Sequence, residues 1–285
     1  MISKLGIGTV QFGLDYGISN IYGKTSLEEV KSILQYAKEA GVDLVDTAKA
    51  YGESEKVLGQ SALAGSFKIV SKCLKVDEKD SLQVQLAGSL KALKVSRLYG
   101  YMAHDANFLI ENSHIWEELL RLKNEGMVAR VGVSLYTLEQ LHKLWSLKIT
   151  PDLVQVPYNL LDRKFESCFE KLKADGTEIH CRSIFLQGLF FMSEDQLSGN
   201  LQLLKKPLAE LRRICFSFEI SMEELALNFV VHNPAVDYAI IGVNTLDQLK
   251  ANVLSLKGLL DNEITERVKK IDILHSKMLN PVNWK

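Results

Sequence analysis

Residues 26–46 read SLEEVKSILQYAKEAGVDLVD, a helical pattern followed directly by a strand pattern. Four apolar residues recur three and four positions apart, on one face of a helix over residues 27–40: Val30, Ile33, Leu34 and Ala37. Gly41 supplies the left-handed conformation that often ends such a helix. The short apolar run Val42–Asp46 then predicts a strand, so this stretch forms one helix–strand unit.

The same alternation recurs along the chain. Short apolar runs predict eight strands: Leu5–Gly8, Val42–Asp46, Lys68–Ser71, Leu98–Met102, Ala129–Val133, Leu153–Val156, Glu178–Arg182 and Val236–Ile241. Amphipathic helical segments follow the strands: Leu27–Ala40, Ser54–Leu63, Ser81–Leu93, Ile115–Asn124, Leu138–Leu147, Phe165–Ala174 and Leu246–Leu256. Further helices are expected at Leu201–Cys215, Met222–Val231 and Ile264–Met278.

Repeated strand–helix units with short loops indicate parallel strands joined by right-handed crossovers. Eight such units close naturally into a (β/α)8 TIM barrel, and 285 residues suit one barrel of this kind. An open, doubly wound sheet is the alternative. It is less favoured because the first strand leads into GTVQFGLDYG, residues 8–17, and not into a GxGxxG turn that opens a helix. We therefore expect a single α/β barrel domain over residues 1–285.

Composition excludes several classes of function. The chain has 34 basic and 35 acidic residues, so its charge does not favour a nucleic-acid partner. No apolar run approaches the ~20 residues that span a bilayer, and the opening MISKLGIGTVQFG is unlike a signal peptide. Four scattered cysteines without a CxxC pair are typical of a reduced, intracellular protein, and six dispersed histidines offer no metal-ligand spacing. We expect a cytoplasmic protein without a metal site, binding neither membrane nor nucleic acid.

Polar side chains follow three consecutive strands at their carboxyl ends, where barrel enzymes hold their catalytic groups. The second strand leads through DLVDTAKAYGESE, residues 43–55, which contains Asp46 and Tyr51. The third strand leads to Lys72 and the fourth to His104. A lysine ammonium beside a phenol lowers the phenol pKa from its usual value of about 10, and a carboxylate would keep that lysine charged. The set suits proton delivery to a carbonyl oxygen by a tyrosine acting as general acid.

DTAKAYGESE, VSK and the histidine after an apolar strand are followed in order by VGVS, VQVPYNLLDR, SIFLQGLF and IIGVNTLDQLKANV. From Leu5 to about Asn252 this series resembles the aldo-keto reductase superfamily. The resemblance implies an enzyme that reduces an aldehyde, ketone or sugar carbonyl to an alcohol. Asp46, Tyr51 and Lys72 would form its catalytic tetrad together with His104, with hydride from NADPH or NADH and a proton from the tyrosine.

The resemblance also implies a cofactor that lies extended across the mouth of the barrel. In its terms, Ser134 and Gln155 would hold the nicotinamide carboxamide, Arg182 would stack on the nicotinamide ring, Ser183 and Gly188 would wrap the pyrophosphate, and Gly242, Asn244, Gln248 and Asn252 would bind the adenosine end. Many members of the superfamily have a tyrosine at the stacking position. A guanidinium plane can also stack on an aromatic face.

Two departures from the superfamily pattern concern the cofactor. Leu135 follows Ser134 where asparagine is usual, so one carboxamide hydrogen bond is lost or replaced. Near Asn244, where many NADPH users place lysine or arginine, the chain has Asp247, although a phosphate favours a cation. Lys250 could compensate, and we expect NADPH to be preferred only narrowly over NADH.

The substrate is less clearly indicated than the reaction. The opening GTVQFGLDYGISN, residues 8–20, resembles that of bacterial members encoded with surface-sugar pathways. A sugar or nucleotide-sugar is therefore one candidate among small carbonyl substrates. The alternative function is a non-catalytic regulatory module that binds a nicotinamide nucleotide, because channel-associated members of the superfamily also keep the tetrad.

Overall fold

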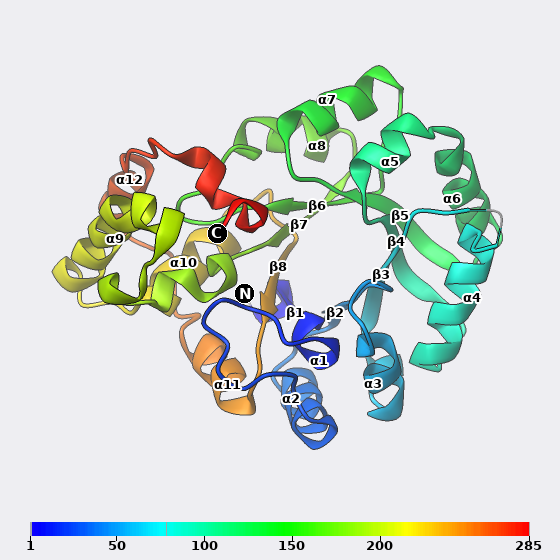
Figure 1. The fold of residues 1–285 in the computed structure, drawn as a ribbon, viewed down its shortest axis with the longest axis horizontal. Coiled ribbons are helices and arrows are strands. Elements are labelled where there is room, and N and C mark those ends of the chain that lie inside the picture. Colours follow the sequence, from blue (N-terminus) through cyan, green and yellow to red (C-terminus); the bar gives the residue numbers. More distant parts are fainter. Residues whose placement is uncertain (1, 78, 285) are drawn as a thin grey trace.

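The computed structural model describes residues 2–77 and 79–284. Eight parallel strands form a closed barrel in chain order (Figure 1): β1 (Leu5–Gly8), β2 (Leu44–Asp46), β3 (Lys68–Cys73), β4 (Leu98–Ala103), β5 (Val128–Ser134), β6 (Leu153–Pro157), β7 (Glu178–Arg182) and β8 (Tyr238–Gly242). The barrel closes where β1 pairs with β8. The expectation of a single (β/α)8 barrel is confirmed.

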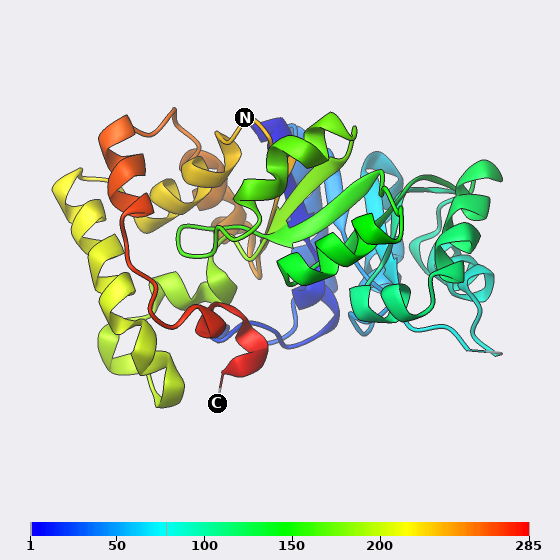
Figure 2. The same cartoon turned by 90° about the horizontal axis from the view of Figure 1, so that it is seen from above.

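Helices surround the barrel: α1 (Val10–Gly13), α2 (Leu27–Glu39), α3 (Ser54–Gln60), α4 (Leu82–Leu93), α5 (Ala106–Glu111), α6 (His114–Asn124), α7 (Leu138–Ser146), α8 (Phe169–Ala174), α9 (Lys205–Ser217), α10 (Met222–Val231), α11 (Leu246–Leu254) and α12 (Asn262–Lys269). Helices α9, α10 and α12 gather on one side (Figure 1). The C-terminal segment runs from α12 back toward the loop that follows β1 (Figure 2).

Strand side chains alternate between two buried regions. A small cluster fills the inside of the barrel: Leu44, Val70, Met102, Leu153, Tyr238 and Ile240. A much larger apolar cluster lies between the strands and the helices and includes Ile7 and Leu34. The alternation fixes which residues of each strand face inward, and therefore which residues reach the mouth of the barrel.

Three helix boundaries differ from the sequence expectation by four or more residues. The helix expected at Ile264–Met278 ends at Lys269, although the next position of its buried face, Ile271, still packs in the core. The helix expected from Leu201 begins at Lys205, two residues before Pro207, which lacks a backbone donor and is tolerated only in a first turn. The helix expected from Phe165 is a 3-10 turn at first and becomes α-helical at Phe169.

Two short helices, α1 and α5, were not expected from the sequence. For α5 the capping pattern was readable, because the Asp105 carboxylate accepts hydrogen bonds from the backbone N–H groups of Asn107 and Phe108. For α1 the contact is tertiary. A Cβ at Gly13 would lie 1.7 Å from the Tyr51 carbonyl oxygen and 2.5 Å from the Ser54 nitrogen, so only glycine allows α1 to pack on this turn.

Gly13→Ala should therefore destabilise the protein by about 1–3 kcal/mol, as overpacking does, because the turn that carries Tyr51 has to move. Gly88→Ala is the matched control: it adds the same methyl group to an exposed helical position with nothing within 4 Å. This control should stabilise the protein by about 0.5–1 kcal/mol through helix propensity. Urea unfolding of both variants checks the pair, and a neutral Gly13→Ala would contradict the close contact.

Candidate active site

The candidate site lies inside the barrel at the carboxyl ends of its strands. Leu44, Val70, Met102, Leu153 and Ile240 belong to the cluster inside the barrel, and the residues two positions further along the chain form the site: Asp46, Lys72, His104, Gln155 and Gly242. Beside these residues a pocket with a cavity volume of about 620 Å³ opens at the carboxyl ends of the strands. Its size is ordinary for a cofactor or small-molecule site.

The four residues expected to form a tetrad lie together. The Lys72 ammonium donates to Asp46 Oδ1 over 2.6 Å and to the Thr47 carbonyl over 2.9 Å. The same ammonium lies 5.1 Å from the centre of the Tyr51 ring. The His104 and Tyr51 rings meet edge to face with centroids 5.8 Å apart. Lys72 is fully buried, so its contact with Asp46 is an ion pair shielded from water.

The protonation of this group differs from the sequence expectation in one respect. Burial raises the pKa of Tyr51, and the opposing effects of Lys72 and Arg182 do not reverse this shift. The phenol pKa is therefore raised and not lowered, because removal of water outweighs the neighbouring cations. Burial lowers the pKa of Lys72, but Asp46 and Tyr51 together raise it by more, so the net shift is upward and the lysine stays charged.

His104 is held neutral. Burial, assisted by the Lys72 charge, lowers the pKa of its imidazole to about 4. At neutral pH the histidine can offer one N–H and one lone pair, but no extra proton. Within this cluster Tyr51 and the Lys72 ammonium are the groups that hold a proton to give.

Two of the residues expected at the nicotinamide end adjoin the tetrad. The Gln155 amide donates to Asp46 Oδ2 over 2.8 Å, so both carboxylate oxygens of Asp46 are engaged. Ser134 pairs with Gln155 in the β5–β6 register, and both side chains line the pocket. Leu135 packs its side chain into the core between strands and helices.

Arg182 ends β7 and lines the same part of the pocket. Its guanidinium lies 4.2 Å from the centre of the Tyr136 ring, so the plane stacks on a protein side chain on one face. It donates to the Leu135 carbonyl over 3.1 Å and to Ser183 Oγ over 3.4 Å. Tyr136 was not among the residues predicted from the sequence, although its place just past the end of the fifth strand was a usable indication.

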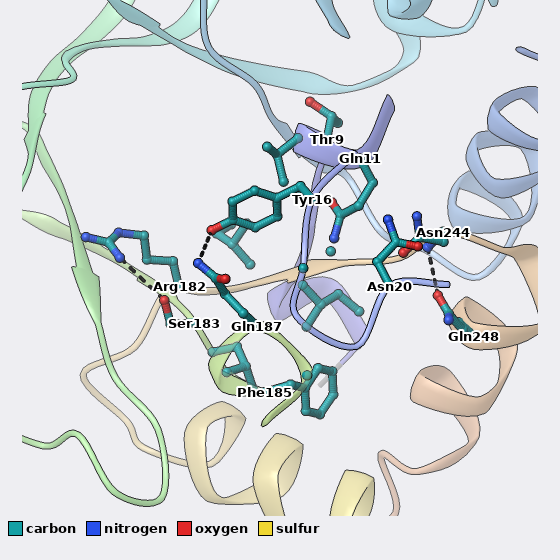
Figure 3. Close-up of a pocket in the computed structure, with 18 of the residues that line it drawn as sticks. Thr9, Gln11, Tyr16, Asn20, Arg182, Ser183, Phe185, Gln187, Asn244 and Gln248 are labelled. Carbon is teal, nitrogen blue, oxygen red and sulfur yellow. Dashed lines mark hydrogen bonds between the residues drawn. The ribbon is translucent and has the colours of Figure 1, made fainter. Parts of the chain in front are cut away.

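Residues 14–23, here called the strap, cross the pocket between its two ends (Figure 3). The Tyr16 hydroxyl accepts a hydrogen bond from the Gln187 amide over 2.6 Å. At Gly188, where φ is +88°, a Cβ would lie 1.8 Å from Ser19 Oγ, so the strap rests directly on the loop after β7. Neither Tyr16 nor Gln187 was predicted from the sequence to belong to the site.

The far end of the pocket contains the residues expected to bind adenosine: Gly242, Asn244, Gln248 and Asn252. Asn244 is held by its backbone N–H to Gln248 Oε1 over 2.7 Å and by its amide to the Gly23 carbonyl over 3.1 Å. The first N–H of α11, at Leu246, donates to Glu29 Oε1 over 2.6 Å. Lys250 lies 5.9 Å from the Tyr36 ring centre and does not line the pocket.

The pocket is suited to a polar ligand. Gln11 Oε1 is buried and has no hydrogen-bond partner among residues 2–77 and 79–284, and its side chain lines the pocket (Figure 3). A buried acceptor of this kind needs a donor from a bound molecule or water. Over the same described residues, no cluster of three or more potential metal ligands occurs. No helix in this part of the chain is long and apolar enough to cross a membrane.

Comparison with known proteins identifies the family of the chain. The model of the aldo/keto reductase family matches residues 4–273. An uncharacterised oxidoreductase of Mycobacterium tuberculosis is 26% identical over 274 residues, covering 88% of this chain and 84% of that protein. The aldo-keto reductase YhdN of Bacillus subtilis is 23% identical over 287 residues, covering 87% and 83%.

Solved structures show the same fold. Aldo-keto reductase AKR11C1 from Bacillus halodurans, in its apo form, superposes with a TM-score of 0.75 at 21% identity, covering 94% of this chain and 91% of that one. The family model spans nearly the whole barrel, including every strand. The chain therefore belongs to the aldo/keto reductase family and is an NAD(P)H-dependent oxidoreductase.

Proposed function

We propose that the chain reduces a small carbonyl compound to an alcohol, with Tyr51 as the proton donor. The observation that carries the proposal is the buried Lys72–Asp46 ion pair beside the Tyr51 ring, with a neutral His104 that meets the same ring edge to face. A bound nicotinamide would supply hydride to the carbonyl carbon. The carbonyl oxygen then takes the phenolic proton, which balances the reduction.

Each side chain has a distinct part in this proton transfer. Tyr51 stays protonated at neutral pH, because burial raises its pKa. As the proton leaves, the Lys72 charge stabilises the phenolate, and Asp46 keeps that lysine charged. Neutral His104 can hold the substrate oxygen by one N–H without competing as an acid.

For the cofactor, the proposed contacts follow the sequence assignment. Ser134 and Gln155 would hold the carboxamide, with Arg182 near the ring, Ser183 and Gly188 at the pyrophosphate, and Gly242, Asn244, Gln248 and Asn252 at the adenosine end. NADPH was narrowly favoured from the sequence. The charges support NADH instead, because Arg182 is the single lysine or arginine among the described residues that line the pocket. Glu29 and Asp247 add negative charge at the start of α11.

The lining near the strap supports a polar substrate. Tyr16, Asn20 and Gln187 face the pocket beside the hydrophobic Phe185 (Figure 3). Hydroxyl and amide groups in such a wall suit a molecule that carries several hydroxyls. Sugar and nucleotide-sugar carbonyls therefore belong in the substrate screen.

Tyr51→Phe should lower kcat by about 10²- to 10⁴-fold, because the general acid is removed, while cofactor affinity is kept. Tyr101→Phe is the matched control. The Tyr101 hydroxyl is buried without a hydrogen-bond partner in the described part of the chain, so its removal should leave turnover intact. The assay follows cofactor oxidation with a panel of aldehydes. Full activity of Tyr51→Phe would refute the mechanism, and tight cofactor binding without any turnover would favour the regulatory module.

The His104 imidazole should titrate with a midpoint of about 4, well below the usual value of about 6.5. Between these two pH values the histidine is protonated in the unfolded chain but stays neutral in the folded one. This contribution to stability is complete above pH 6.5 and is lost as the pH falls toward 4. NMR titration of the ring C–H resonance checks the midpoint, and His104→Gln identifies the signal. A midpoint near 6.5 would contradict a desolvated, neutral imidazole.

NADH should bind about tenfold or more tightly than NADPH, since Arg182, the single lysine or arginine among the described lining residues, lies at the other end of the pocket, and Glu29 and Asp247 place carboxylates at the start of α11. Glu29→Gln keeps an acceptor for the Leu246 N–H but removes the charge, so it should tighten NADPH binding about 3- to 10-fold without affecting NADH. Glu28→Gln, on the exposed side of the same helix, is the control. Fluorescence titration gives both dissociation constants, and tighter binding of NADPH by the parent would refute the preference.

A further inference from the structure

The pocket contains one positive charge that no residue of the described chain neutralises. Lys72 is paired with Asp46, and the pKa of His104, about 4, keeps its imidazole uncharged. Arg182, in contrast, contacts the Leu135 carbonyl, Ser183 Oγ and the Tyr136 ring, and within residues 2–77 and 79–284 it forms no ion pair. The tetrad end of the pocket therefore carries one uncompensated positive charge.

The guanidinium is fixed in place and still has capacity to bind. Tyr136 covers one face, and the two neutral acceptors use two of its five N–H groups. Stacking and these two hydrogen bonds orient the planar fork before any ligand arrives, which reduces the entropy lost on binding. A partly buried, unpaired cation is costly unless an anion joins it.

The position of this charge relates it to the reacting groups. Burial raises the pKa values of Tyr16 and Tyr51 and lowers that of His104, and the Arg182 charge opposes the first two shifts and adds to the third, as a cation near all three does. Figure 3 shows Arg182 at one end of the pocket and Asn244 with Gln248 at the other. An anion bound by Arg182 would therefore lie close to the carbonyl being reduced.

From this arrangement we propose that the enzyme selects carbonyl substrates that carry an anionic group, a carboxylate or a phosphate, which Arg182 binds while Tyr51 protonates the carbonyl oxygen. The Tyr16 hydroxyl lies at the edge of the same space and accepts from Gln187, so it can donate its own proton to the anion. The inference rests on the proposed carbonyl reduction and adds a substrate class to it. In this proposal Arg182 binds the anionic group of the substrate and also lines the pocket beside the nicotinamide.

The test compares 4-formylbenzoate with its methyl ester, which presents the same aldehyde without the charge. The parent enzyme should show a kcat/KM for the acid about tenfold or more above that for the ester. Arg182→Gln should lower kcat/KM for the acid, mainly through KM, about 10- to 100-fold more than it lowers kcat/KM for the ester, so that the acid-to-ester ratio falls toward one. Arg97→Gln is the control. It removes the same charge from an exposed position just before β4, at the opposite end of the barrel, and should change kcat/KM for neither the acid nor the ester.

A second pair, glyceraldehyde 3-phosphate and glyceraldehyde, distinguishes phosphate from carboxylate as the preferred anion. Calorimetry with terephthalate, a dianion that is not reduced, measures anion binding independently of turnover, and Arg182→Gln should weaken it at least about tenfold. NADH affinity is measured for every variant. A loss of NADH affinity in Arg182→Gln without any change in the acid-to-ester ratio would assign the arginine to the cofactor phosphates and overturn the inference.

The outcomes separate the two proposals. Reduction of the ester at least as well as the acid by the parent would overturn the anionic substrate class and leave carbonyl reduction standing. Binding of terephthalate that depends on Arg182, without turnover of any aldehyde, would overturn the proposed reduction and leave the anion site standing. An acid-to-ester ratio that persists in Arg182→Gln would show that another group selects the charge.

Discussion

The buried ion pair between Lys72 and Asp46 is the interaction on which the site depends. A lysine with no exposed surface would lose its proton without a carboxylate beside it. The pairing of β2 with β3 places that carboxylate, because Asp46 lies opposite Val70 and Lys72 is the next inward-facing residue of β3. Loss of either partner would leave an isolated buried charge, which typically costs about 3–5 kcal/mol.

Much of the fold could be predicted from the sequence, because strand and helix patterns are local. Short apolar runs indicated all eight strands, and the order in which Asp46, Tyr51, Lys72 and His104 follow them indicated one site at the mouth. Strand ends moved by a few residues, as for β2, which begins at Leu44 and not at Val42. Each inward-facing position at the end of a strand was accessible to this reasoning, since side chains alternate with a period of two.

What the sequence did not indicate depends on contacts between distant segments. Tyr16 and Gln187 are separated by 171 positions, so no periodicity relates them. Arg182 can stack on Tyr136 only because β5 and β7 flank β6, so that the carboxyl ends of these two strands lie close together at the mouth of the barrel. The direction of the Tyr51 pKa shift was misjudged for a similar reason: its charged neighbours could be named from the sequence, but the loss of water around it could not.

The strap affects how the dinucleotide and the substrate enter and leave the mouth of the barrel. It crosses between the tetrad end and the adenosine end and is fastened by the Tyr16–Gln187 hydrogen bond and by the close approach of Ser19 to Gly188. A dinucleotide long enough to occupy both ends has to pass beneath this bridge, whereas a small substrate needs access to one end alone. Exchange of the dinucleotide therefore requires an opening of the bridge that exchange of substrate and alcohol does not. Because each reduction uses up one reduced nicotinamide, that opening would recur once in every turnover.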